Sequence, residues 1–206
     1  MKKDNPYDER YAAEGFYWPA RPSSTCLRLI EILGPVGEPR PTLLDLGCGE
    51  GRNAVYLAGH GFAVTGLDVS LPGLEKTRRY AAEKGVEVDT VHADMTEYEL
   101  TGPYDVIFST GSLQYLAPEM RECRFEDYKA HTRVGGLNAM SAFVRKPFID
   151  PAPDAEADAY PYRSGELLGY YWDWEIVYST EETFDCMSSG VPHRHAVSRV
   201  IARRVG

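Results

Sequence analysis

The chain has 206 residues, of which 43% are hydrophobic and 26% are charged, a composition typical of one globular domain with a substantial core. Its 31 acidic residues outnumber its 22 basic residues, and the net charge of −9 disfavours binding to a nucleic-acid backbone or to anionic lipid. Four widely spaced cysteines and a charged start with no apolar segment behind it predict a cytoplasmic protein with reduced thiols, no secretory signal and no membrane span.

Apolar strands alternate with helical stretches from residue 42 onward. We expect five strands with three helices between them, then a proline-rich acidic loop at 145–161, then a helix and two more strands. This alternation predicts an α/β protein with a doubly wound, parallel sheet. The expected strands are 42–46, 62–67, 86–91, 104–109, 137–144, 174–178 and 196–203, and the expected helices are 52–58, 70–84, 118–131 and 165–171.

A glycine-rich turn follows the first expected strand. Asp45 lies two residues before Gly47, and Gly49 and Gly51 come next, so the backbone can take positive φ angles and admit a ligand closely. Dinucleotide enzymes use a similar loop to seat a pyrophosphate, but a carboxylate at its mouth suits an ammonium or sulfonium group. The turn therefore predicts a ligand that is cationic at this end.

Residues suited to ligand binding also follow the next three strands. Asp68 ends the second strand, where a carboxylate can accept hydrogen bonds from the two hydroxyls of a ribose. Asp94 and Met95 follow the third strand and offer an acceptor and an apolar face to an adenine. The fourth strand opens into a turn of small residues at 109–112. Four consecutive strand ends with such residues predict one binding site.

Together these segments resemble the binding signature of class I S-adenosylmethionine-dependent methyltransferases over about residues 41–144. Within that superfamily, the runs that begin at Tyr104, Gly165 and Ile201 are similar to the tellurite-resistance methyltransferase family. The resemblance implies a Rossmann-like, doubly wound, mostly parallel seven-stranded sheet with an antiparallel C-terminal strand. It implies a single methyltransferase domain over 1–206, made of an N-terminal helical cap (1–40), a cofactor-binding core (41–144), an acidic proline-rich loop or lid (145–163) and a C-terminal helix and strands (164–206).

The resemblance also implies S-adenosylmethionine as cofactor and S-adenosylhomocysteine as product. It assigns Asp45 to the methionine amino group, Asp68 to the ribose hydroxyls and Asp94 to the exocyclic amine of adenine. The expected cofactor-binding residues are Tyr11, Asp45, Gly47, Cys48, Gly49, Asn53, Asp68, Val69, Ser70, Ala93, Asp94, Met95, Thr110 and Gly111.

Methyl transfer from a sulfonium is an in-line displacement of an already activated group, so alignment and exclusion of water can supply most of the catalysis. We expect a small-molecule acceptor, such as a thiol, an amine or a metalloid or chalcogen oxyanion. His193 and Arg194 match a His-Arg pair of the resembling family, and we expect His193 to act as a base and Arg194 as an anion anchor, although the Gly-Asn-Arg pattern that follows this pair in the family is absent. The expected acceptor-binding residues are Trp18, Arg21, Ser112 and Tyr115.

Two other functions fit parts of the pattern. A nicotinamide-dependent oxidoreductase also needs glycines and an acid at Asp68, but it favours a GxGxxG loop, and Arg52 stands where the last glycine belongs. A non-catalytic cofactor-binding protein would keep the binding residues without turnover.

Metals and partners complete these expectations. Cys186, His193 and His195 carry metal-ligand chemistry, but their spacing matches no common zinc motif, and we expect no bound metal. We expect no nucleic-acid or membrane partner and a monomer or a homodimer.

Overall fold

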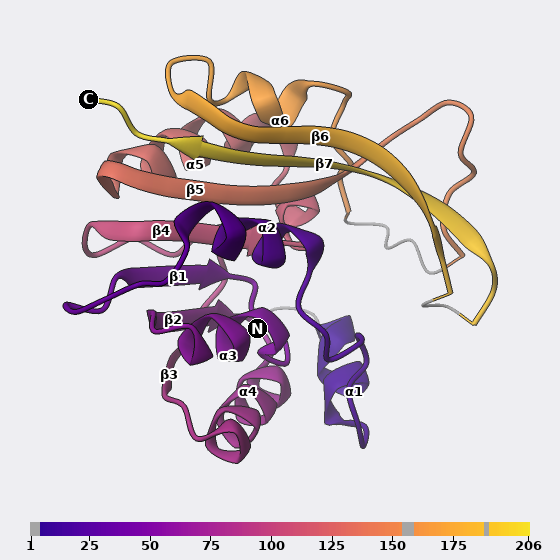
Figure 1. Cartoon of the computed structure of the whole chain (residues 1–206). Coiled ribbons are helices and arrows are strands. Elements are labelled where there is room, and N and C mark those ends of the chain that lie inside the picture. The colour runs from indigo at the N-terminus through magenta and orange to yellow at the C-terminus, as the bar shows by residue number, and fades with distance from the viewer. Residues whose placement is uncertain (1–4, 154–158, 188–189) are drawn as a thin grey trace.

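The computed structural model describes residues 5–153, 159–187 and 190–206, and a seven-stranded sheet forms its centre. The strand order is β3-β2-β1-β4-β5-β7-β6 (Figure 1). Strands β1 to β5 pair in parallel, whereas β7 runs antiparallel to both β5 and β6. The Rossmann-like sheet with an antiparallel C-terminal strand is therefore confirmed.

The elements follow the expected order along the chain. The strands are β1 (Thr42–Leu46), β2 (Ala63–Asp68), β3 (Val88–His92), β4 (Tyr104–Thr110), β5 (Thr132–Val144), β6 (Glu175–Cys186) and β7 (His193–Arg203). The helices are α1 (Pro6–Ala12), α2 (Ser24–Leu33), α3 (Arg52–Gly59), α4 (Leu71–Lys84), α5 (Pro118–Ala130) and α6 (Glu166–Gly169), with one 3-10 turn, η1 (Leu113–Tyr115).

Two hydrophobic cores lie on opposite faces of the sheet because successive strand residues point to opposite faces. Leu43 packs with Leu29 of α2 and Leu57 of α3 on one face. Leu44, the next residue of β1, packs with Phe125 of α5 on the other. Figure 1 shows α2 and α3 in front of the strands. The two covered faces leave the ends of the strands as the places where a ligand can reach the backbone.

Several elements differ in extent from the prediction. Strand β5 begins at Thr132, five residues before the expected start, with a register shift against β4. Strand β6 continues to Cys186 and β7 begins at His193, so the two strands form a longer hairpin than expected. The added part of β6 is polar and largely exposed, so no apolar pattern marks it, and pairing with β7 holds it as a strand. The expected helix at 165–171 is the single turn Glu166–Gly169.

The N-terminal helix and the expected lid both reach the carboxyl edge of the sheet. Helix α1 lies beside α4 at this edge (Figure 1). The expected lid is anchored at both ends, because Tyr160 N donates to Gln114 O at 2.7 Å and Arg145 N donates to Tyr162 O at 2.9 Å. The acidic centre of the lid, 154–158, lies outside the described residues. Within the part of the chain that the structure describes, no helix has the length and apolarity needed to cross a membrane.

Candidate active site

The glycine turn after β1 is the centre of the site. Gly47, Gly49 and Gly51 have φ angles of 75°, 57° and 83°, in the left-handed region that favours glycine. A β-carbon on Gly47 would lie 2.4 Å from the β-carbon of Ser112, so no larger residue fits. The N–H of Gly47 donates to the carbonyl of Leu67 at 2.8 Å, which ties the turn to the end of β2.

Asp45 is the most unusual residue of the site. It is only 1% exposed, and its Oδ2 has no hydrogen-bond partner among the described residues. Burial, strengthened by the negative charge of Asp68 and opposed by the Arg52 guanidinium, raises the pKa of Asp45 to about 8. Burying a carboxyl oxygen without a hydrogen-bond partner destabilises the folded chain, and a ligand with a donor group would remove this cost.

Asp68 holds the glycine turn against the start of α4. Its two carboxylate oxygens accept from Gly49 N at 2.7 Å and from Ser70 N at 2.8 Å. Burial raises the pKa of Asp68, while these backbone N–H groups oppose the rise. Each carboxylate oxygen has further lone pairs, so Asp68 can still accept from ligand hydroxyls. Ser70 caps α4, because its hydroxyl accepts from Gly73 N at 3.3 Å.

Hydroxyl groups from the end of β4 contact the start of the glycine turn. The hydroxyls of Ser109 and Ser112 donate to the carbonyl of Leu46 at 2.9 and 2.8 Å and lie 2.7 Å from each other. Asn53, on the first turn of α3, donates from Nδ2 to the hydroxyl of Thr110 at 3.0 Å. These bonds connect the ends of β1 and β4, so the first and fourth expected segments form one surface.

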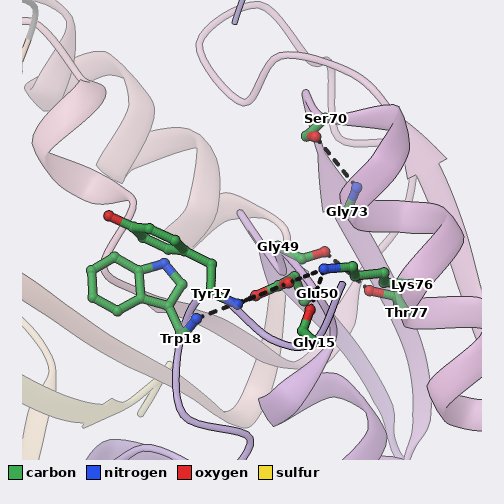
Figure 2. A network of polar contacts seen from close by, with 9 residues as sticks. All are labelled: Gly15, Tyr17, Trp18, Gly49, Glu50, Ser70, Gly73, Lys76 and Thr77. Atoms are coloured by element: carbon green, nitrogen blue, oxygen red, sulfur yellow. Dashed lines mark hydrogen bonds and ion pairs between the residues drawn. The ribbon is translucent and has the colours of Figure 1, made fainter. Parts of the chain in front are cut away.

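Glu50 connects the glycine turn to the N-terminal segment. Its buried carboxylate accepts from Tyr17 N at 2.9 and 3.1 Å and from Trp18 N at 3.3 Å, and it pairs with Lys76 Nζ at 2.8 Å (Figure 2). Lys76 also donates to the carbonyl of Gly15. The network fastens residues 15–18 to both the glycine turn and α4.

Aromatic rings of the N-terminal segment lie over the same turn. Tyr11 is buried, and its hydroxyl oxygen is 3.0 Å from the position that a β-carbon on Gly49 would take. The hydroxyls of Tyr7 and Tyr115 are 2.8 Å apart, which joins α1 to the turn after β4. The Tyr7 and Tyr17 rings pack edge to face with centroids 6.5 Å apart. The N-terminal segment thus lies over the glycine turn.

The residues that follow β2 and β3 lie at the neighbouring strand ends of the candidate site. Val69 is 41% exposed, while Met95 is buried in the hydrophobic core. Asp94 Oδ1 accepts from both the backbone N–H and the hydroxyl of Thr96, at 2.8 and 2.6 Å. Ala93 is half-buried, and its N–H donates to the carbonyl of Asp68 at 3.1 Å. This bond joins the ends of β2 and β3.

The other expected residues lie in different settings. Cys48 is buried against Gly66 of β2, while Gly111 is exposed. Trp18 and Tyr115 are half-buried near the turn, and Arg21 is exposed. His193 and Arg194 are consecutive residues of β7 and point to opposite faces of that strand. Arg194 pairs with Asp185 and Thr183 of β6, whereas His193 faces His195.

Three functional candidates escaped the sequence prediction. Glu50 and Lys76 are distant in the chain and form an ion pair only in the folded protein. The acidic residue between Gly49 and Gly51 was the one sequence signal that could have indicated Glu50. Arg121 is buried, pairs with Glu166 at 2.5 Å, lies 3.7 Å over the Tyr162 ring and donates to the Tyr160 carbonyl. It therefore holds the end of the expected lid against α5, and no sequence motif indicates this role.

A family model described as "Tellurite resistance protein TehB" matches residues 15–189. The chain belongs to the TehB family. A Haemophilus influenzae protein named "Probable S-adenosyl-L-methionine-dependent methyltransferase TehB" is 30% identical over 135 residues, which are 66% of this chain and 46% of that protein. The 2-heptyl-1-hydroxyquinolin-4(1H)-one methyltransferase of Mycobacteroides abscessus is 26% identical over 166 residues, 80% of this chain and 71% of that protein.

Solved structures of methyltransferases share the fold. The crystal structure of TehB from Haemophilus influenzae aligns with a TM-score of 0.77 at 24% identity, over 96% of this chain and 65% of that one. Magnesium protoporphyrin IX methyltransferase from Synechocystis, solved with bound S-adenosylhomocysteine, aligns with a TM-score of 0.67 at 16% identity, over 88% and 80%. The chain spans about half the length of the Haemophilus relative. The predicted family and fold are confirmed, and the cofactor named for the relatives is the predicted one.

Proposed function

We propose that this TehB-family chain transfers a methyl group from S-adenosylmethionine to a small-molecule acceptor. The observation that carries the proposal is Asp45, a buried carboxyl group whose Oδ2 has no hydrogen-bond partner in the described chain, beside a turn of three left-handed glycines. Asp45 and Asp68 together can bind a ligand that has both a cationic group and hydroxyl groups. The relatives' names agree with this chemistry.

The residues present fit the cofactor. Asp45 would accept from the ammonium of its methionine part, and Arg52, whose charge acts on Asp45, would pair with the carboxylate of the same amino acid. The positive φ of Gly47 and Gly49 lets the backbone approach closely, and Asp68 keeps lone pairs for the ribose. The exposed Val69 and the residues after β3 would border the adenine.

When bound, the cofactor supplies a methyl group already activated by the sulfonium charge. The chain then has to position the acceptor in line and exclude water. Residues 15–18, held over the turn by Glu50, and the ring of Tyr11 would exclude water from one side. The ends of the lid, hydrogen-bonded near Arg145 and Tyr160, would border the other side.

We propose a thiol, an amine or a metalloid or chalcogen oxyanion as the acceptor. The opposite orientation of His193 and Arg194 separates their roles, so one acceptor atom would meet His193 as a base while Arg194 acts elsewhere. The rings of Tyr7 and Tyr17, with the Arg10 guanidinium 4.9 and 5.3 Å from their centroids, offer an aromatic surface near the turn.

The test separates binding from turnover. S-adenosylhomocysteine and S-adenosylmethionine should raise the melting temperature of the chain, whereas NADH should not. Formation of S-adenosylhomocysteine is then followed with thiols, amines, tellurite and selenite as acceptors, with Asp45→Asn as the binding-defective control. A chain that NADH stabilises and S-adenosylmethionine does not contradicts the proposal. Binding without turnover on any acceptor would instead favour a non-catalytic cofactor-binding protein.

A further inference from the structure

The end of the β6–β7 hairpin brings three metal-ligating side chains together. Cys186 is the last residue of β6, and His193 and His195 lie at the start of β7. One ligand atom from each residue lies within 4.8 Å of the others, and all three side chains are half-buried. From these residues we infer a binding site for a zinc-class divalent cation at the end of the β6–β7 hairpin.

Strand register explains why the three side chains share a face. Cys186 and His193 are directly paired across the hairpin, so their side chains project to the same side. His195 lies two residues after His193, and the period of two in a strand returns it to that side. Arg194 projects to the opposite side and pairs with Asp185. The sequence spacing resembles no common zinc motif because the pairing of two strands, and not a local turn, brings the ligands together.

The tautomer of His193 suits a metal ligand. Its Nδ1 lies 2.8 Å from the carbonyl of Val191, and a carbonyl only accepts, so Nδ1 carries the proton and Nε2 presents its lone pair. A second hydrogen bond of this kind accompanies nearly every metal-binding histidine and fixes its ring. His193 Nε2 points at His195 Nε2, 2.9 Å away.

The ring of His195 is held by packing. Its centroid lies 4.7 Å from that of Phe143 and 5.5 Å from that of Phe184. Zinc bonds of about 2.0–2.1 Å to nitrogen and about 2.3 Å to sulfur place tetrahedral ligand atoms roughly 3.3 to 3.6 Å apart. The two Nε2 atoms would therefore separate slightly and the Cys186 sulfur would approach, which side-chain rotation at a hairpin end allows.

The proposed ligand set has a clear chemistry. One thiolate and two imidazoles suit zinc and other borderline or soft cations better than calcium or magnesium. Metal binding deprotonates the Cys186 thiol, and the released proton goes to solvent. It also moves the His195 proton from Nε2 to Nδ1, so that Nε2 can bind the metal. Three protein ligands leave a fourth tetrahedral position for water or another anion. The inference does not rest on the proposed methyl transfer, but it excludes the base role proposed for His193, because a metal-bound Nε2 has no lone pair left and Nδ1 donates to the Val191 carbonyl.

Zinc alone is the first probe. The full chain, freed of metal with a chelator, is titrated with zinc by calorimetry, and one site is expected. Loss of a ligand in Cys186→Ser or His195→Ala should weaken binding by at least the roughly 10–100-fold that loss of an outer-shell partner typically causes. Cys123→Ser and His60→Ala alter an exposed cysteine and an exposed histidine elsewhere and should bind zinc like the unaltered chain.

Two further measurements keep the inference testable if a variant folds poorly. Cobalt in the unaltered chain should give a thiolate-to-cobalt charge-transfer band, which Cys123→Ser keeps and Cys186→Ser loses. In the unaltered chain, zinc should protect Cys186 from a thiol reagent while the exposed Cys123 still reacts. Equal zinc affinity in Cys186→Ser and in the unaltered chain, or no thiol protection by zinc, would overturn the inference and leave a His193–His195 hydrogen bond alone.

Discussion

Replacement of Asp45 by asparagine should stabilise the protein and abolish cofactor binding. The pKa of this carboxyl rises from its ordinary 3.8 to about 8, mainly because the folded chain buries it. At roughly 1.4 kcal/mol per pH unit, ionising Asp45 inside the folded chain costs on the order of 5 kcal/mol. Asparagine has nearly the same shape and never ionises, so it avoids this cost.

The sign of the pH dependence follows from proton counting. Between about pH 4 and pH 8 the folded chain keeps the Asp45 proton while the unfolded chain releases it, so the stability contributed by this group falls as the pH rises. The Asp45→Asn variant should therefore match the unaltered chain near pH 4, exceed it increasingly up to about pH 8, and keep a constant advantage above that pH. At about 2–4 °C per kcal/mol for a chain of this length, the advantage in melting temperature would reach on the order of 10 °C.

Thermal unfolding from pH 5 to pH 9 measures this difference. Asp105→Asn is a matched control of opposite sign. Partial burial raises the pKa of Asp105, but hydrogen bonds from Thr42 and the charge and hydrogen bond of Arg133 lower it overall. Its contribution is lost as the pH falls, so Asp105→Asn should be less stable at pH 7 and recover in acid. A pH-independent gap for Asp45→Asn would refute the reasoning.

Calorimetry adds the functional half of the prediction. Asp45 is largely protonated in the unbound chain at pH 7, and an ammonium group beside it favours the carboxylate. Binding of S-adenosylmethionine should therefore release a proton, seen as a binding enthalpy that changes with the ionisation enthalpy of the buffer. Undiminished binding by Asp45→Asn would exclude Asp45 as the partner of the cofactor.

Three other substitutions test the architecture of the site. Gly47→Ala should abolish cofactor binding and lower the stability strongly, because its β-carbon would overlap the side chain of Ser112. Gly85 has a similar φ of 69° but open space around it, so Gly85→Ala should cost only about 1–2 kcal/mol in thermal unfolding. Glu50→Gln should weaken cofactor binding by about 2 kcal/mol and speed proteolysis of residues 13–21, while the exposed Glu99→Gln should do neither. Arg121→Met should destabilise the fold by about 3 kcal/mol in urea unfolding, because the half-buried Glu166 carboxylate and the Tyr160 carbonyl lose the buried guanidinium that donates to them; equal stability would argue against the anchoring role.

Most of the sheet was predictable because local patterns decide it. The buried strands β1, β2 and β4 are short apolar runs, and the spacing of the glycines after β1 indicates a turn with positive φ, although it does not show that Ser112 excludes a β-carbon at Gly47. The polar second half of β6 was not predictable, because its strand conformation depends on pairing with β7. The same hydrogen bonds between strands set the register that brings Cys186 to His193.

The sequence by itself determined the fold class, the glycine turn and the acids at the strand ends, since each depends on residues close together in the chain. Only the tertiary structure decided which of those acids lack a partner. Asp68 and Glu50 accept from backbone N–H groups, whereas the buried Oδ2 of Asp45 has no hydrogen-bond partner among the described residues. The partners of a buried carboxyl group come from residues distant in the chain. The sequence therefore showed where the acidic residues lie along the chain, and only folding determined which carboxyl oxygen has no hydrogen-bond partner.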